Sequence, residues 1–287
     1  MYSGEYKKKL TTAEKAVEPV PGECTIVHGM AAGEPPALLG AVADRARGGG
    51  FKKVRIYTLL PMAHASRTVL DPALSDVIRP HSWFVSASDR NLVRVGLNEF
   101  VPNEFHEVPR IVKEMSIDAV LTTVSPMDRA GYFSFGAIND YISTAARHCR
   151  RLIVEVNPRM PRVFGDSLVH ISEIDAIVEN EAPLMEIIPA EPKPEAEVIG
   201  RSIAELVPDG ATIQLGFGGI PNAVASYLGS HKDLGLHSEL FCPGMVGLIN
   251  KGVITGRKKN IHDTGGGKQK DSGDGGKKKA SKPKTEA

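Results

Sequence analysis

Short, uniformly apolar runs alternate with helical patterns along most of this 287-residue chain, and this alternation limits its fold more than any other feature. Cys24 to His28 and Val54 to Leu60 have the character of buried strands, and Gly33 to Ala46 between them carries apolar residues at helical spacing. A strand, a helix and a second strand in this order form a parallel pair. The chain is therefore predicted to build open α/β sheets with helices on their faces.

A proline-rich segment divides this alternation into two predicted domains. Residues 189–196 hold three prolines and no apolar anchor, which is typical of a stiff linker. We predict an N-terminal domain at residues 1–188 and a partial second domain at residues 197–262. Residues 263–287 form a tail rich in Gly and Lys, with seven lysines against four acidic residues, and this composition predicts disorder.

The composition of the chain indicates which kinds of binding partner and which cellular compartment to expect. The net charge is only +1 and the tail is basic, so the rest of the chain has no basic excess that would attract nucleic acid. Cys24, Cys149 and Cys242 lack the number for a disulfide framework and the spacing of a metal site. No apolar run approaches the ~18 residues of a membrane helix, and Met1 to Leu10 lacks a signal-peptide core. These features predict a cytoplasmic protein with no metal, membrane or nucleic-acid partner.

A glycine turn is the first candidate for a functional site. The segment Gly216 to Pro221 follows a predicted strand at Ala211 to Leu215 and opens a predicted helix that runs through Tyr227. Its glycines leave backbone N–H groups open to a ligand, although an ordinary strand-to-helix turn is also compatible with them. A proline stands where a dinucleotide-binding motif has its third glycine, so that motif is not matched. The predicted binding residues are Gly216, Gly218, Gly219 and Ile220.

A lone acidic residue follows about 20 residues later. Glu239 lies inside the short strand-like run Leu236 to Leu240, where a carboxylate is costly unless a partner or a reaction uses it. A surface or edge position is the ordinary alternative. His237, two residues earlier, would share its face of a strand and is equally compatible with a structural role. A set of N–H donors beside one carboxylate indicates acyl chemistry.

The pattern G-x-G-x-I-P-x-A-V followed by H-S-E resembles the acetyl-CoA hydrolase/transferase family, nearest its butyrate and 4-hydroxybutyrate CoA-transferase branch. The resemblance runs from about residue 20 to residue 262, and it includes the segments Ser125 to Tyr132 and Asn157 to Arg162. It implies two similar open α/β halves. Since members of the family continue well beyond residue 262, it also implies that the second half is incomplete here, by C-terminal truncation or a frameshift.

The resemblance further implies a CoA-transferase of acetate and short-chain fatty acid metabolism. Such an enzyme moves CoA between a short-chain acyl-CoA and a carboxylate such as acetate through a covalent glutamyl-CoA intermediate, here on Glu239. The amide at or beside Ile220 would bind the oxyanion, and coenzyme A would be a substrate rather than a cofactor. His28, Ser125 and Pro126 are expected to line the cleft between the domains, with a structural role for His28 as the alternative. A homodimer is the default expectation.

Two alternatives remain open at this stage. An acyl-CoA hydrolase would share nearly every residue, with water resolving the intermediate, and a truncated chain would be weakly active or non-catalytic. One segment also departs from the family pattern, because Phe241 to Gly244 replaces the usual Ser-Asp-Gly type of turn after the H-S-E motif. Pro243 in this segment removes a backbone donor.

Overall fold

The computed structural model describes residues 2–186 and 193–259, and the chain divides into two compact units, Met1–Glu186 and Ile187–Ala287. The tail predicted at residues 263–287 lies outside the described residues, as does the first half of the predicted linker, residues 189–192. The last residues of that predicted linker belong instead to a helix that begins at Pro194.

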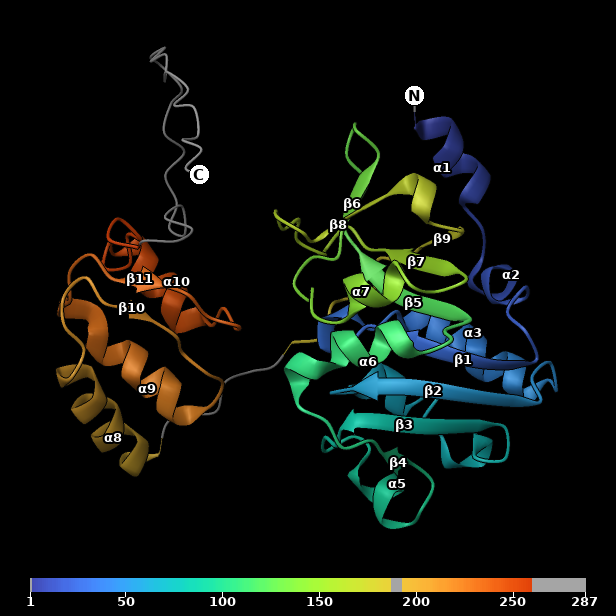
Figure 1. The fold of residues 1–287 in the computed structure, drawn as a ribbon, viewed down its shortest axis with the longest axis horizontal. Coiled ribbons are helices and arrows are strands. Elements are labelled where there is room, and N and C mark those ends of the chain that lie inside the picture. The colour runs from blue at the N-terminus through green and yellow to red at the C-terminus, as the bar shows by residue number, and fades with distance from the viewer. Residues whose placement is uncertain (1, 187–192, 260–287) are drawn as a thin grey trace, which may run out of the picture. The chain divides into compact units, whose positions relative to one another are not determined.

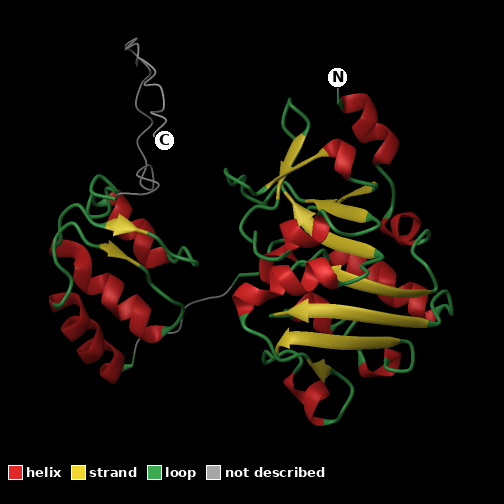
Figure 2. Ribbon diagram, viewed as in Figure 1, coloured by secondary structure: helices red, strands yellow, loops and turns green. Residues whose placement is uncertain are grey.

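The first unit is built on one parallel sheet, as the alternating pattern predicted (Figure 1, Figure 2). Its strand order is β4-β3-β2-β1-β5-β7-β9, and every neighbouring pair is parallel. The α/β fold class is thereby confirmed. The strands are β1 (Glu23–His28), β2 (Lys53–Leu59), β3 (Ile78–Phe84), β4 (Glu99–Phe100), β5 (Ala119–Val124), β7 (Leu152–Val156) and β9 (Ala176–Glu179).

Helices bury both faces of this sheet, because successive side chains of a strand point to opposite faces. Ile26 of β1 belongs to the core cluster under α3 (Pro36–Arg47), whereas Val27 belongs to the cluster that includes α6 (Val108–Glu114) and α7 (Ile142–Ala146). Figure 1 shows α6 and α7 in front of the sheet. The remaining elements of the unit are α1 (Ser3–Lys9), α2 (Ala13–Val17), α4 (Ala63–Ser66), α5 (Arg90–Arg94), and the antiparallel pair β6 (Tyr132–Ser134) and β8 (Leu168–His170).

The N-terminal segment is more deeply integrated than its polar composition suggests. The helix α2 buries Ala13, Ala16 and Val17 in the core cluster that contains α3. Just before α2, the Thr11 N–H donates to the Ile177 carbonyl of edge strand β9 at 2.9 Å. Three small apolar residues are thus enough to bury one face of this short helix.

The second unit packs a few helices over a two-stranded parallel sheet. Its elements are α8 (Pro194–Glu205), β10 (Thr212–Ile213), α9 (Gly219–Tyr227), β11 (Gly235–Leu236) and α10 (Pro243–Asn250). Gly200 lets α8 approach α9 closely, since an added Cβ there would lie 2.8 Å from the Cβ of Ala223. Leu215, Val224, Met245 and Leu248 form part of its own core cluster.

None of the helices in residues 2–186 and 193–259 is both long and apolar enough to cross a bilayer.

Candidate functional site

The strand order of the first unit reverses between β1 and β5, which lie side by side in the sheet. Open parallel sheets bind ligands outside the carboxyl ends of their strands at such a reversal. The loops after these two strands, residues 29–35 and 125–131, therefore mark the place in this unit where a ligand is expected. The predicted residues His28, Ser125 and Pro126 all lie at this edge.

The loop after β1 folds back tightly on β5. A Cβ added to Gly29 would lie 2.3 Å from the Gly33 carbonyl oxygen and 2.7 Å from Thr122 Oγ1, so no other residue fits there without a shift of the backbone. Thr123 Oγ1 also donates to the carbonyl oxygen of Glu34 at 2.8 Å. The loop is thus fixed against its neighbouring strand.

His28 is enclosed by this packing and has no exposed surface. Its Nδ1 lies 2.8 Å from the Gly29 carbonyl oxygen, and its Nε2 has no hydrogen-bond partner among the described residues. Burial lowers the pKa of His28 to about 4, so the ring is neutral at pH 7. Within the first unit, His28 therefore contributes to the interior behind the loop and does not reach an open groove.

Ser125 and Pro126 differ in accessibility although they are neighbours. Ser125 is 1% exposed, and its hydroxyl accepts from the Ser134 N–H at 3.0 Å and donates to the Pro126 carbonyl at 3.1 Å. Pro126 is exposed and, with Met127, lines a groove of about 490 Å³ at the carboxyl ends of β5, β7 and β9. Of the three residues predicted in this unit, Pro126 alone is exposed, whereas His28 and Ser125 are buried.

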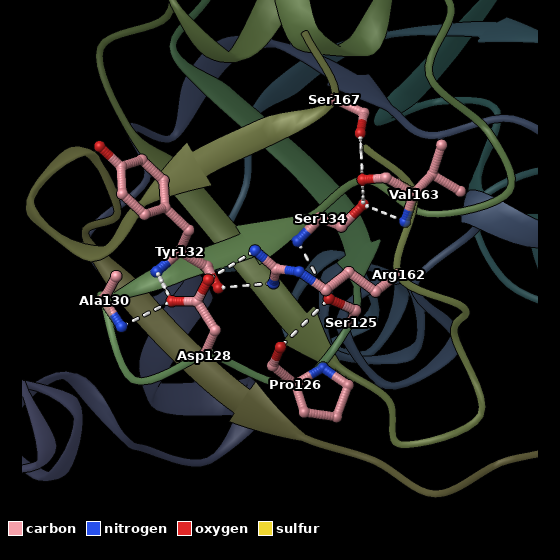
Figure 3. Close-up of polar contacts among 9 residues, drawn as sticks. All are labelled: Ser125, Pro126, Asp128, Ala130, Tyr132, Ser134, Arg162, Val163 and Ser167. Carbon is pink, nitrogen blue, oxygen red and sulfur yellow. Dashed lines mark hydrogen bonds and ion pairs between the residues drawn. The ribbon is translucent and has the colours of Figure 1, made fainter. Parts of the chain in front are cut away.

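The two sequence segments that carried the resemblance in this unit meet in one polar network (Figure 3). Arg162 Nη2 lies 2.6 Å from Asp128 Oδ2, and Arg162 Nη1 donates to the Tyr132 carbonyl at 3.1 Å. Ser134 Oγ contacts both the N–H and the carbonyl oxygen of Val163 at 3.0 Å. These contacts hold the Pro126 loop in place, so the two segments act as a framework for the edge of the groove.

Glu34 is a buried carboxyl group at this edge that the sequence pattern did not single out. It is 3% exposed, and its oxygens accept from the N–H groups of Met62 at 2.6 Å and Ala65 at 3.3 Å, at the start of α4. Burial raises the pKa of Glu34 from 4.5 to about 7, against the opposing effect of these backbone N–H groups. No signal in the sequence distinguishes it from the many exposed glutamates of the chain.

The raised pKa of Glu34 predicts a measurable pH dependence of stability. The folded state binds the proton more tightly than the unfolded chain, so the contribution of Glu34 is complete below pH 4.5 and is lost as the pH rises to about 7. The parent chain should lose up to about 3 kcal/mol relative to Glu34→Gln over this window. Urea unfolding of both proteins at pH 4.5, 6 and 8 measures the difference, and parallel pH profiles would contradict the prediction. Because the other titrating groups are common to both proteins, their effects cancel in this comparison.

In the second unit, the predicted glycine turn connects β10 to α9. Gly218 has φ of +132°, which favours glycine, and α9 begins at the next residue without a side-chain cap. A Cβ added to Gly218 or Gly219 would contact nothing within 4 Å. The first N–H groups of a helix have no partner within the helix, and Pro221 has no N–H at all. The amides of Gly219 and Ile220 are therefore open donors in the part of this unit that the structure describes.

Glu239 lies beyond the sheet rather than inside it. The predicted strand ends at Leu236, and Glu239 stands in an exposed bend three residues later. The strand prediction was wrong past Leu236, because the neighbouring strand β10 has only two residues with which β11 can pair. The last hydrogen bond between the two segments' backbones runs from the His237 N–H to the Ile213 carbonyl at 3.0 Å. Among the described residues, no hydrogen bond or ion pair engages the Glu239 carboxylate. Its exposure agrees with a surface role as well as with a reacting group.

Pro243 does not disturb this site. It occupies the first turn of α10, where a backbone N–H would have no helical partner. Cys242 and Met245 on either side are buried in the core of the unit. The missing backbone N–H of Pro243, the point at which the sequence departs from the family pattern, therefore breaks no hydrogen bond of the helix.

Apolar side chains surround both loops. Phe217 and Ile220 on the glycine turn are 65% and 41% exposed, and Leu240 and Phe241 after Glu239 are 40% and 63% exposed. A carboxylate, open amides and apolar surface are what an acyl-transfer site requires. In residues 2–186 and 193–259, no group of three His, Cys, Asp or Glu side chains gathers in a way that would hold a metal ion.

Comparisons with known proteins agree on one family. Residues 1–189 match the acetyl-CoA hydrolase/transferase N-terminal domain. The chain is 39% identical over 259 residues to a 4-hydroxybutyrate coenzyme A transferase of Clostridium kluyveri, with 90% of this chain and 59% of the relative covered. It is 32% identical over 268 residues to a butyryl-CoA:acetate CoA-transferase of Anaerostipes caccae, with 91% and 59% covered.

Among solved structures, RipA from Yersinia pestis superposes with a TM-score of 0.87 at 46% sequence identity. That similarity covers 90% of this chain and 62% of RipA. The chain thus spans 59% of the length of the curated relatives described above. The similarity extends into the second unit, because the matched region is longer than the first unit alone.

Proposed function

Because this chain belongs to the acetyl-CoA hydrolase/transferase family, we propose that it serves as a CoA-transferase acting between a short-chain acyl-CoA and a carboxylate such as acetate. The observation that carries the proposal is that Glu239 and the open N–H donors of Gly219 and Ile220 lie on the loops that follow the two parallel strands of one small sheet. Glu239 is exposed, and among the described residues its carboxylate has no hydrogen-bond partner. The names of two relatives supply the substrate class, 4-hydroxybutyrate and butyryl-CoA with acetate.

The proposed reaction proceeds through covalent intermediates on Glu239. Its carboxylate attacks the thioester carbonyl, the C–S bond breaks, and a mixed anhydride and a CoA thiolate result. The thiolate then attacks the glutamyl carbonyl and releases the original acyl group as a carboxylate, which leaves glutamyl-CoA. An acceptor carboxylate reverses the two steps and departs as a new acyl-CoA. Every step exchanges one activated acyl bond for another, so coenzyme A is a substrate and no further cofactor takes part.

The glycine turn has a defined part in this scheme. Each attack places negative charge on a carbonyl oxygen, and preorganised N–H groups stabilise that oxyanion by about 3 kcal/mol per donor. Gly219 and Ile220 are assigned this role because their amides are uncapped and the space beside them is open. The exposed apolar side chains of Phe217 and Phe241 give an unbranched acyl chain a favourable surface.

An assay of acyl-CoA with and without acetate tests the proposal. The 287-residue chain is incubated with butyryl-CoA, and the products are separated by chromatography. Acetyl-CoA that forms only when acetate is present supports CoA transfer. Free thiol released at the same rate without acetate would replace the proposal by a hydrolase, and an absence of both products would overturn it.

A further inference from the structure

The side chain of Ser238 joins the two loops that the proposed reaction uses. Its hydroxyl donates to the Leu215 carbonyl oxygen at 3.0 Å and accepts from the Leu215 N–H over a longer distance of 3.4 Å. Ser238 directly precedes Glu239, and Leu215 directly precedes the glycine turn. One side chain thus connects the nucleophile loop to the donor loop.

The hydrogen bond between Ser238 and Leu215 lies just beyond the last paired residues of the two-stranded sheet. The last paired residues are Ile213 and Leu236, and the last ladder bond runs from the His237 N–H to the Ile213 carbonyl. Beyond that point, the strands would be free to separate if only backbone pairing held them. The Ser238 hydroxyl supplies the next contact between the two chain segments, one residue before Glu239.

The partner of Ser238 is itself held firmly. Leu215 is 7% exposed and belongs to the core cluster that also contains Val224 of α9 and Met245 of α10. The hydroxyl therefore bonds the Glu239 loop to a buried residue rather than to an exposed one. The contact thus limits how far the backbone at Ser238, one residue before Glu239, can move from Leu215, one residue before the glycine turn.

We propose that Ser238 is a positioning residue, which sets the distance between the Glu239 carboxylate and the oxyanion-binding amides of the glycine turn. The inference rests on the proposed function of Glu239. Ser238 does not touch the reacting atoms in this scheme, and its effect is exerted through the geometry of its neighbour. A misplacement of about 1 Å at a reacting centre costs on the order of 100-fold in rate.

The test compares Ser238→Ala, Ser238→Thr and the control Ser226→Ala. Ser226 also donates a hydroxyl hydrogen bond to a carbonyl, that of Ala223 at 2.7 Å, but this bond stays within α9 and connects no loops. The covalent adduct on Glu239 is trapped by borohydride after a short incubation with butyryl-CoA, and its rate of formation is followed by mass spectrometry. Ser238→Ala should form the adduct about 10- to 100-fold more slowly than the parent at saturating substrate, with KM changed less than about threefold.

The other variants separate positioning from general destabilisation. Ser238→Thr keeps the hydroxyl and should stay within about fivefold of the parent rate, and Ser226→Ala should match the parent. Amide exchange of the peptide over residues 212–220 should accelerate in Ser238→Ala alone. Adduct formation by Ser238→Ala at the parent rate overturns the inference and leaves the role of Glu239 intact. A parent protein that acquires no glutamyl adduct overturns the proposed function and this inference with it.

Discussion

Replacing Glu239 by glutamine is expected to lower the rate of CoA transfer by about 10⁴-fold or more, because a neutral amide cannot attack a thioester. The amide nearly matches the carboxylate in shape, and residue 239 is exposed, so the fold should tolerate the change within about 0.5 kcal/mol. The initial rate of acyl-CoA turnover measures the loss, and borohydride trapping should show no modified residue at position 239.

A control variant shows that the effect belongs to position 239. Glu205→Gln makes the same chemical change at the exposed end of α8 and should leave the rate unaltered. If Glu239→Gln retains more than about a tenth of the parent rate, the carboxylate is not the covalent carrier, and the open amides of the glycine turn would then need another nucleophile.

Glu239 shows what the sequence could indicate about the candidate site and what it could not. A lone acid in an apolar run only drew attention to it, and the resemblance of the H-S-E motif to the family pattern made it the candidate nucleophile. The length of the strand was not predictable in the same way, because a strand ends where its neighbour stops pairing and β10 contributes only two residues. The geometry of the site thus depends on contacts such as that of Ser238 with Leu215, which connect residues 23 positions apart.

The first unit was predictable for a different reason. Runs such as Ala119–Val124 consist only of apolar residues and threonine, a composition that favours a strand, and all six residues are buried. The order of the strands and the reversal between β1 and β5 followed from neither periodicity nor composition. They depend on which crossovers the helices make, and they decide which loops share an edge of the sheet.

The sequence signal that drew attention to Glu239, a lone acid in an apolar run, also occurs at Glu155, which was not among the predicted site residues. Glu155 interrupts the apolar run Leu152–Val156 and is fully buried in β7. Its Oε2 accepts from the N–H groups of Ala37 and Leu38 at 2.9 and 3.1 Å, at the start of α3. A lone acid in an apolar strand therefore indicates that something engages the carboxylate, and here the partner is a helix terminus rather than a substrate.

This contact has a consequence for ligand binding. The start of the helix after the first strand is where many α/β proteins bind a phosphate. In this chain that terminus has no cap from its own segment, and the Glu155 carboxylate fills the position from within the protein. The N–H groups of α3 are thus already used, which agrees with the absence of a dinucleotide-binding motif in the sequence.

Glu155→Ala is accordingly expected to destabilise the first unit by about 3 to 5 kcal/mol. The substitution removes the acceptor of three donors, the N–H groups of Ala37 and Leu38 and the Asn180 side chain, whose Nδ2 donates to Glu155 Oε1 at 2.7 Å. Of these donors the Leu38 N–H is buried and the other two are part-buried. It also leaves a cavity, because residue 155 is fully buried. Burial raises the pKa of Glu155 to about 7, so measurement at pH 8 examines the ionised form.

The single tryptophan makes this measurement specific to one unit. Trp83 lies in β3 and is 3% exposed, so its fluorescence during urea unfolding reports on the first unit alone. The midpoint should fall with the predicted loss of free energy, and the melting temperature should drop by about 10 °C. The matched change Glu114→Ala removes a carboxylate that pairs with Arg110 at the surface, and should cost no more than about 0.5 kcal/mol. A loss below about 1 kcal/mol for Glu155→Ala would mean that water or another side chain satisfies the start of α3, and that the buried carboxylate does not hold this helix to β7.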